Sequence, residues 1–473
     1  MTRTLTSGTD PDPQIALEKP KPAVWRNGLV VLLALGLAWG LYLWMPYPPT
    51  VKKALCLLVF IGLLWLTEAV HLTVTALLVP LGALLLGFPG LTTSSALAPF
   101  ADPIVFLFLG GFALATALRV QQLDRKMAGA LLALSGGHFG RSVFLLFAVT
   151  AVLSMGISNT ATAAMMLPLT VGILSPLDAD KDRRTFSFVL LGVAYAASIG
   201  GIGTLVGSPP NAIAARAAGI DFAQWLWIGI PLVLVLMPVM VLTLWLVLRP
   251  KLNRQIGFVM ADVPWTLARL LTLGVFALTA LGWTLGAAPL KAMGIQSPDT
   301  FFAMAGAVAV VALGLASWRD VAAHTDWGVL ILFGGGLALG EVLGASGASK
   351  VLGAQVADAL QGAAPWVILL AVASFMVLLS EFASNTAAAA LLVPVFAAIA
   401  AQMGLPAEVL VVVVALAASC GFALPVATPP NALVFGTGHV TQRVMLRAGL
   451  ALDAACIVVL TAWGWLVFLQ WTQ

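Results

Sequence analysis

The sequence predicts an all-α polytopic membrane protein with about eleven transmembrane helices and two re-entrant helical hairpins, arranged as two inverted repeats. Of its 473 residues, 61% are hydrophobic and only 9% are charged, whereas a soluble domain carries about a quarter charged residues. Apolar stretches long enough to cross a bilayer, which takes roughly 20 residues, occupy most of the chain. A short polar motif then occurs twice within them.

Windows of about 18 or more mostly apolar residues mark the expected spans. They lie at 28–46, 54–70, 71–89, 103–119, 185–205, 223–248, 266–287, 300–317, 328–346, 408–424 and 448–470. Two further apolar stretches, 143–174 and 365–401, are interrupted, and we expect each to enter and leave on the same side as a hairpin. Residues 1–24 are polar and lack a cleavage site, which predicts a disordered cytoplasmic tail rather than a secretory signal.

The distribution of Lys and Arg predicts a cytoplasmic N-terminus in the cell inner (plasma) membrane. Of the 23 basic residues, 18 fall on the predicted inner side and five on the outer side. The five outer residues are Lys52, Lys53, Arg216, Lys291 and Lys350. Cytoplasmic loops carry the excess of Lys and Arg, so this split favours hairpins that do not cross. Because the basic residues form no single patch, nucleic acid is not an expected partner.

The most informative feature is an internal duplication, in which three segments recur in the same order. They are SNTATAAMMLP (Ser158–Pro168) with SNTAAAALLVP (Ser384–Pro394), VGSPPNA (Val206–Ala212) with VATPPNA (Val426–Ala432), and LGGFALA (Leu109–Ala115) with GGLALG (Gly335–Gly340). Five expected spans separate the two hairpins, and an odd number gives the copies opposite orientations. Inverted repeats with interrupted helices are typical of secondary transporters, whose site lies where the breaks meet.

Each Ser-Asn-Thr motif stands where a hairpin turns inside the membrane. Polar side chains in hydrocarbon are costly unless they are satisfied. The second half-helix begins at this turn, so its free N–H groups and positive dipole end face the cavity. Ser, Thr and Asn are also common N-caps, which offers a purely structural interpretation. The matching second copy, with a matching helix break downstream, favours a binding site instead.

The paired prolines, Pro209–Pro210 and Pro429–Pro430, remove amide donors and break their helices. The freed carbonyls, with hydroxyl and Asn oxygens, are hard ligands of the kind that Na⁺ prefers. No Lys or Arg lies within either hairpin, yet a dianion at the membrane midplane needs compensating positive charge. Bound cations and helix N-termini are the charge available, so coupling to Na⁺ is a physical expectation.

One carboxylate breaks the symmetry between the copies. Glu381 lies three residues before the second SNT, where the first copy has Met155. It could orient the hairpin or act as a proton site, and orientation is the preferred interpretation. The three cysteines and four histidines are scattered, which argues against a disulfide framework and a metal cluster. Without paired aspartates or a His–carboxylate set, we do not expect an intramembrane enzyme.

The paired SNT and PPN motifs resemble those of the divalent-anion:sodium symporter family, which includes bacterial and animal carriers of dicarboxylates and citrate. The resemblance covers nearly the whole chain. It implies secondary active transport that couples Na⁺ to uptake of C4-dicarboxylates (succinate, malate, fumarate). It also implies a homodimer, in which a scaffold domain makes the dimer contacts and a transport domain carries the site across the bilayer as an elevator.

The resemblance further implies two sodium sites and a set of substrate contacts, carried over by motif position. The first sodium site would use Ser154, Ser158, Asn159 and the carbonyl of Gly207. The second would use Ser380, the carbonyl of Ala383, Asn385 and the carbonyl of Ala427. The substrate would contact Asn159, Thr160, Asn385 and Thr386, with Ser208, Thr428 and Pro429 nearby. Ser380 stands where many relatives have Thr, but it keeps a hydroxyl.

The domains expected from this reading alternate along the chain. They are the tail (1–24), scaffold helices with the start of the first repeat (25–130), the first hairpin and broken helix of the transport domain (140–248), scaffold helices (249–350), and the second hairpin, broken helix and last helix of the transport domain (351–473). Two alternatives remain on this scaffold, a dicarboxylate exchanger and a carrier of an inorganic divalent oxyanion such as sulfate. A channel is disfavoured because broken helices suit alternating access.

Overall fold

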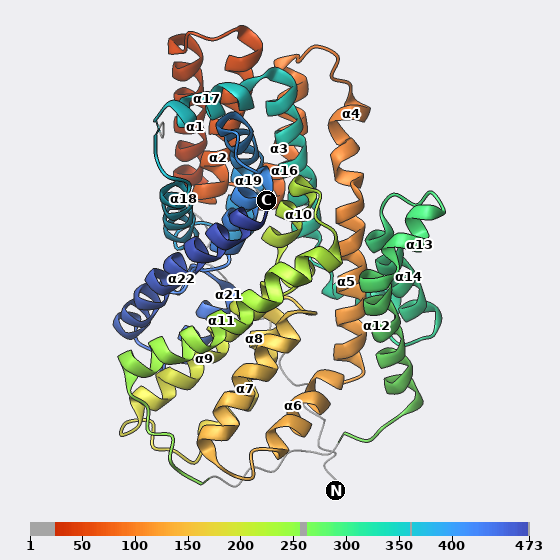
Figure 1. Cartoon of the computed structure of the whole chain (residues 1–473), viewed down its shortest axis with the longest axis vertical. Helices are drawn as coiled ribbons and strands as arrows, with labels where there is room; N and C mark the ends of the chain where they lie inside the picture. The colour runs from red at the N-terminus through yellow and green to blue at the C-terminus, as the bar shows by residue number, and fades with distance from the viewer. Residues whose placement is uncertain (1–23, 256–262, 360–361, 472–473) are drawn as a thin grey trace, which may run out of the picture.

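The protein is all-helical throughout residues 24–255, 263–359 and 362–471, which are the residues described in the computed structural model (Figure 1). The only extended pairing among them is one isolated bridge between His138 and Gln255. The all-α polytopic class predicted from the sequence is therefore confirmed. The predicted disordered tail, 1–24, lies outside the described residues except for Val24, where the first helix begins.

The expected spans form helices within a few residues of their predicted bounds. These helices are α1 (Val24–Trp44), α2 (Pro49–Thr67), α3 (Leu72–Leu86), α5 (Pro103–Val120), α9 (Arg183–Gly201), α11 (Phe222–Leu248), α12 (Leu267–Leu285), α14 (Pro298–Ala312), α16 (Trp327–Ser346), α20 (Ala407–Ala418) and α22 (Gln442–Trp471). Several ends differ from prediction by about four to six residues, among them the starts of α2 and α22 and the end of α14. Helix α9 stops at Gly201 and α20 at Ala418, because the chain unwinds there before each Pro-Pro pair.

Each interrupted apolar stretch is a pair of helices joined by a tight turn. The first hairpin is α7 (Phe139–Ser154) with α8 (Asn159–Leu174), and the second is α18 (Pro365–Ser380) with α19 (Asn385–Met403). The remaining helices, not expected from hydropathy, are short: α4 (Thr93–Leu97), η2 (Ala98–Ala101), α6 (Leu123–Ala133), α10 (Pro209–Ala218), α13 (Ala287–Ala292), α15 (Trp318–His324), α17 (Ala348–Ala359) and α21 (Pro429–Gly436).

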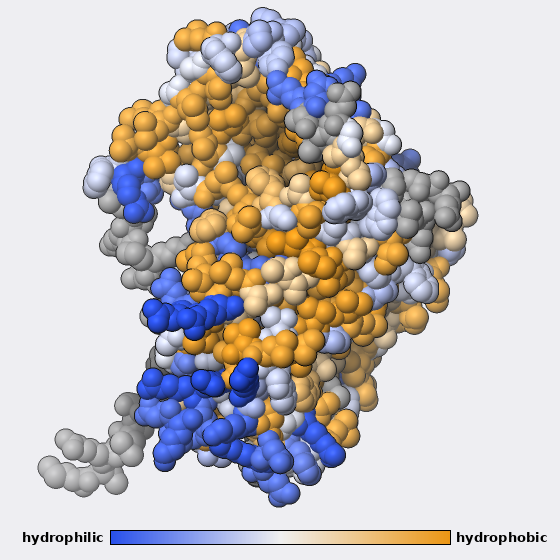
Figure 2. All heavy atoms as spheres, turned by 60° about the vertical axis from the view of Figure 1, so that its left-hand side comes forward, coloured by the Kyte–Doolittle hydropathy of each residue, from blue (hydrophilic) through white to orange (hydrophobic). Residues whose placement is uncertain are grey.

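Nine helical stretches in the described ranges are long and apolar enough to cross a membrane. One of them is α19, the second arm of a hairpin. The other eight, together with the shorter apolar helices α3, α14 and α20, make up the eleven expected spans. Apolar side chains dominate the face shown in Figure 2, and hydrophilic ones gather mainly at its lower end. Such a broad apolar surface suits contact with lipid.

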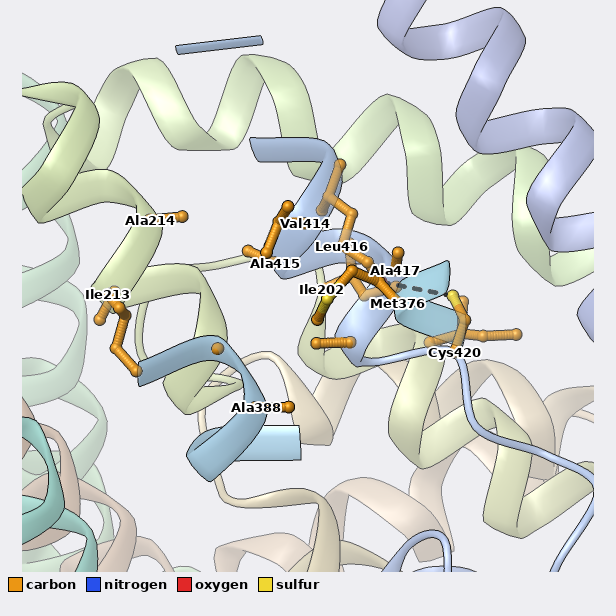
Figure 3. Packing of buried hydrophobic residues seen from close by; sticks show 14 of the residues in the cluster. Ile202, Ile213, Ala214, Met376, Ala388, Val414, Ala415, Leu416, Ala417 and Cys420 are labelled. Atoms are coloured by element: carbon orange, nitrogen blue, oxygen red, sulfur yellow. Dashed lines mark hydrogen bonds between the residues drawn. The ribbon is translucent and has the colours of Figure 1, made fainter. Parts of the chain in front are cut away.

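The centre of the molecule is built on α9 and α20, which lead into the two helix breaks. Nearly every residue of both helices is buried. Helix α9 packs on α7, α8 and α11, while α20 packs on α10, α18, α19 and α22. Figure 3 shows the join between the halves, where Ile213 and Ala214 of α10 lie near Val414 and Ala415 of α20. The two broken helices are therefore held in one continuous apolar core.

The glycine pairs of the duplicated LGG segment mark close helix contacts that repeat in the two halves. A Cβ added to Gly110 of α5 would lie 2.4 Å from the carbonyl oxygen of Ala303 on α14. A Cβ added to Gly335 of α16 would lie 2.6 Å from the Cβ of Ala76 on α3. Small residues allow membrane helices to approach closely. The α5–α14 and α16–α3 pairs therefore form a second, peripheral set of equivalent contacts.

The two hairpins reach the centre from opposite ends of the molecule. In Figure 1, α7 and α8 occupy the lower half, whereas α18 and α19 lie in the upper half. This arrangement is the one expected for copies of opposite orientation. Whether each hairpin enters and leaves on one membrane face stays a prediction.

Gly200 in α9 offers a test of this packing. A Cβ at Gly200 would lie 2.3 Å from the carbonyl oxygen of Ala151 on α7, so Gly200→Ala should overpack the core and cost about 1–3 kcal/mol. We expect a lower melting temperature of the purified protein in detergent. Gly274→Ala in α12 is the matched control, because nothing lies within 4 Å of its added Cβ. Equal melting temperatures for the two variants would contradict the packing.

Candidate functional site

Each SNT motif begins the second arm of its hairpin. Ser158 is the N-cap of α8, and its Oγ accepts the N–H of Ala161 at 3.3 Å. Ser384 is the N-cap of α19 and accepts the N–H of Ala387 at 3.4 Å. The capping role considered from the sequence is therefore realised by the serines. The asparagine and threonine that follow stand in the first helical turn, where they are available for other partners.

The asparagine of each PPN motif holds the helix break in shape. Nδ2 of Asn211 donates to the carbonyls of Gly201 and Thr204 at 2.9 and 2.7 Å. Nδ2 of Asn431 donates to the carbonyls of Gly421 and Leu424 at 3.2 and 3.0 Å. In both repeats the partners lie ten and seven residues before the asparagine. A carbonyl left without a hydrogen bond in lipid costs several kcal/mol. The asparagine amides avoid this cost by donating to the carbonyls of the unwound backbone.

In the first repeat three oxygen-bearing groups surround the Asn159 amide, and two of them, Ser154 Oγ and the carbonyl of Gly207, belong to the predicted sodium site. Ser154 Oγ lies 2.7 Å from Asn159 Oδ1 and 2.6 Å from the carbonyl oxygen of Ala197, and its one hydrogen can be donated to only one of them. With the Asn159 amide turned over, its Nδ2 would donate to the carbonyls of Ala197 and Gly207, each at 3.1 Å. In the other orientation Oδ1 takes that position and faces only oxygens. Asn159 Oδ1 then has only oxygen neighbours. This arrangement is favourable if the amide turns so that Nδ2 donates to them, or if a cation binds between the oxygens.

The second repeat assembles the equivalent groups less tightly. A Cβ added to Gly421 would lie 3.0 Å from Ser380 Oγ and 3.4 Å from the Cβ of Ala427, so these three residues are neighbours. Oδ1 of Asn385 is buried without a hydrogen-bond partner in the described structure. Such a group loses the full desolvation free energy unless a ligand satisfies it. Oδ1 of Asn211 and Oδ1 of Asn431 are likewise without a partner, and the use of the Asn385 oxygen by a cation stays a prediction.

The residues predicted to contact the substrate differ in burial. Ser208 and Thr428 are each 4% exposed, whereas Thr160 and Pro429 are exposed and Thr386 is half-buried. Their roles as substrate contacts stay predictions. The carbonyl of Ala383, the remaining predicted sodium ligand, belongs to a residue that is 6% exposed in the turn between α18 and α19.

The two repeats meet directly at the breaks. Ser208 Oγ of the first repeat lies 3.2 Å from Ser419 Oγ of the second. Tyr195 Oη of α9 donates to the carbonyl of Phe422 at 2.7 Å. Helices α8 and α19 begin at the SNT motifs and α10 and α21 at the PPN motifs, so the positive ends of their dipoles lie at the hairpin turns and the helix breaks.

Several residues of the site were not singled out from the sequence. The carbonyl of Ala197 joins the first oxygen cluster, Ser419 joins the two halves, and Gly201 packs against Asn159, whose Oδ1 would lie 2.2 Å from an added Cβ. None of them belongs to the repeated motifs, so only the fold reveals them. The PPN asparagines did carry a signal, because both copies keep them. Across the described residues, no group of three His, Cys, Asp or Glu side chains could hold a metal ion.

The citrate transporter family matches residues 62–417 and 360–471. An uncharacterised transporter of Haemophilus influenzae is 47% identical over 453 residues, covering 94% of this chain and 98% of that protein. The sodium-dependent dicarboxylate transporter SdcS of Staphylococcus saprophyticus is 33% identical over 443 residues, covering 86% of this chain and 84% of SdcS.

A solved structure shows a similar fold at low identity. The YdaH transporter of Alcanivorax borkumensis has a TM-score of 0.58 and 16% identity, covering 85% of this chain and 99% of YdaH. Together with the fold and the broken-helix site, these similarities define a polytopic membrane transporter. The chain belongs to the citrate transporter family and, as its motifs predict, to the divalent-anion:sodium symporter family.

The contrasting roles of the asparagines can be tested by stability. Asn431→Ala leaves two carbonyls of the break without donors, at about 1–3 kcal/mol for each unsatisfied group, and should lower the melting temperature measured without ligand. Asn385→Ala removes an oxygen that has no partner, so its melting temperature should match or exceed that of the wild type. The reverse order would exclude the roles assigned to these two residues.

Proposed function

We propose that this transporter couples Na⁺ to the uptake of C4-dicarboxylates such as succinate, malate and fumarate. The observation that carries the proposal is the duplicated cluster of neutral oxygens at the two helix breaks. Neither hairpin carries Lys or Arg near its SNT turn, since Arg141 stands at the far end of α7, so we take the positive charge that a dianion needs to come from bound cations and helix N-termini. The sodium-dependent dicarboxylate transporter SdcS, a relative over most of the chain, supports the same choice of ion and substrate.

Two sodium ions are proposed, one in each repeat. Ser154, Ser158, Asn159 and the carbonyl of Gly207 would hold the first, with the carbonyl of Ala197 as a further ligand suggested by the fold. Ser380, Asn385 and the carbonyls of Ala383 and Ala427 would hold the second. The Ser158 hydroxyl already accepts one N–H as the cap of α8, and its remaining lone pair is the part available to a cation.

The substrate carboxylates would lie between the ions, against Asn159, Thr160, Asn385 and Thr386. Ser208, Thr428 and Pro429 border the same space. Hydroxyl and amide donors orient the carboxylates, and the ions neutralise them. Because no side chain in this group titrates near neutral pH, selection of a dianion rests on the number of bound cations and on the spacing of the two repeats.

Alternating access by an elevator movement is proposed from an asymmetry in how the two repeats are covered. Gly111 of α5 packs on Val206 in the first break, with 2.4 Å from an added Cβ to Cγ1. Gly156 at the tip of the first hairpin packs on Phe276 of α12. In the second repeat the corresponding surface is open, with Phe382 74% and Val426 79% exposed. The first half is therefore covered by α5 and α12 while the second is not.

The proposed moving unit is the transport domain, residues 140–248 and 351–473, against scaffold helices in 25–130 and 249–350. A homodimer in the cell inner membrane, with a cytoplasmic N-terminus, completes the proposal. The exposed apolar side chains of the scaffold helices would face lipid and the second protomer, since they have no covering partner within one chain.

Succinate uptake into proteoliposomes tests the coupling. With an inward Na⁺ gradient, we expect uptake that does not require trapped succinate and that is lost when choline replaces Na⁺ at fixed pH. Uptake that needs trapped substrate and ignores the gradient would instead define an exchanger. Inhibition by sulfate stronger than by malate or fumarate would assign an inorganic oxyanion as the substrate.

The proposed ligands are tested by two asparagine variants. Asn159→Ala and Asn385→Ala should each abolish Na⁺-driven uptake, because each removes an oxygen from one cation cluster and a contact to the substrate. Asn253→Ala, in the loop after α11, is the matched control and should transport normally. Uptake retained in either site variant, with normal expression and folding, would remove that residue from the site.

A further inference from the structure

Two buried carboxyl groups, Glu381 and Asp453, lie beside the helix break of the second repeat. Glu381, at the end of α18, is 3% exposed, and Asp453, on α22, is 4% exposed. Oε1 and Oε2 of Glu381 accept the backbone N–H groups of Ala423 and Leu424, each at 2.8 Å. Oδ1 of Asp453 accepts the N–H of Phe422 at 3.2 Å. Together the pair binds three consecutive backbone donors.

These contacts satisfy donors that the broken helix has released. Between α20 and α21 the chain is unwound over residues 419–428, so its N–H groups lose their helical acceptors. Each carboxyl oxygen accepts a hydrogen bond from an amide that would otherwise be buried without an acceptor. The side chains of Glu381 and Asp453 also contact each other. The pair therefore ties the second hairpin and α22 to one short stretch of backbone.

The first repeat builds the same break without any carboxylate. Met155 corresponds to Glu381 by the spacing of the SNT motifs, and its Cε would lie 2.9 Å from a Cβ added to Gly203. Val233 corresponds to Asp453, since Gly229 and Gly449 pack against the two breaks in equivalent ways. The carboxyl pair is thus not a requirement of the repeated fold.

The two breaks differ in what holds them from outside. In the first, Val206 packs against Gly111 of α5, which fixes the segment just before Gly207. In the second, the equivalent Val426 is 79% exposed. The unwound segment of the second repeat therefore lacks the contact with a neighbouring helix that fixes the first one. It is held instead by the hydrogen bonds to Glu381 and Asp453.

We propose that Glu381 and Asp453 are positioning residues for the second half of the binding site. By fixing the backbone at 422–424, they keep Ala427 and Thr428 in register with Ser380 and the second SNT motif. Neither carboxylate needs to touch Na⁺ or the substrate. The transport measurements rest on the proposed function. The position of the segment is measured separately by cysteine labelling, which does not depend on it.

The buried cysteines report directly on this segment. Cys420 lies at its start and is 0% exposed, while Cys56 lies in α2 and is 9% exposed. We expect Glu381→Met, which introduces the residue of the first repeat, to make Cys420 react with a maleimide while Cys56 stays protected. Peptide mass spectrometry of the labelled protein separates Cys420 from Cys56 and from the third cysteine, Cys456 of α22. Met155→Leu in the first repeat is the matched control and should leave both cysteines unreactive.

Asp453 supplies a pair of variants that are similar in shape but differ in polarity. Asp453→Asn keeps an oxygen for the N–H of Phe422 and places an amide donor toward Glu381, so Cys420 should stay protected. Asp453→Val, again the residue of the first repeat, removes the acceptor and should expose Cys420. In proteoliposomes, Asp453→Val should raise the Na⁺ concentration for half-maximal succinate uptake roughly tenfold or more, and Asp453→Asn should restore it.

Several outcomes would overturn the proposal. One is a Glu381→Met protein in which Cys420 stays protected and the half-saturating Na⁺ concentration is unchanged. Another is an Asp453→Asn protein that behaves like Asp453→Val. If Glu381→Met exposes Cys56 as well, the whole protein has unfolded, and the Asp453 pair decides the question. A wild-type protein that ignores Na⁺ would refute the proposed function, while the labelling result would still stand for or against the positioning role.

Discussion

The structure depends on satisfying backbone groups where helices break inside the membrane. A binding site for a polar ligand needs unwound backbone at the bilayer midplane, yet lipid offers no hydrogen bonds to it. Asn211 and Asn431 solve this problem with one side chain each, bridging carbonyls across the break. The serine caps of α8 and α19 do the same for the hairpins. Oδ1 of Asn385 remains without a partner in the described structure, and it is the oxygen at an SNT motif that a ligand can use.

The same constraint explains why the two repeats share their helix contacts but differ in the residues that pack around each helix break. Equivalent glycines bring α5 to α14 and α16 to α3, and equivalent asparagines close both breaks. Val206 of the first break packs against α5, whereas the equivalent Val426 of the second break is exposed. The second break instead has a hydrogen-bonding carboxyl group, Glu381, where the first has Met155. An exposed segment next to a binding site needs another source of order, and buried carboxylates bonded to consecutive amides provide it.

Much of this architecture could be predicted from the sequence, because bilayer thickness limits helix length and duplicated motifs reveal the repeat. The helices agree with the expected spans to within a few residues, and the hairpins turn at the SNT motifs. The short helices, such as α10 and α17, escaped prediction because they are too short for a hydropathy window. The carbonyl of Ala197 and the hydroxyl of Ser419 also escaped it, since a backbone oxygen carries no residue signature and one serine in an apolar run is unremarkable.

A site that contains no arginine or lysine has a consequence for the energetics of the membrane. Moving one elementary charge through 100 mV costs or releases about 2.3 kcal/mol. With two sodium ions, a bound dianion is fully neutralised, and the residues that hold it are themselves uncharged. On that stoichiometry a transport cycle moves no net charge, so the sodium concentration gradient, rather than the membrane voltage, would set how far the substrate accumulates.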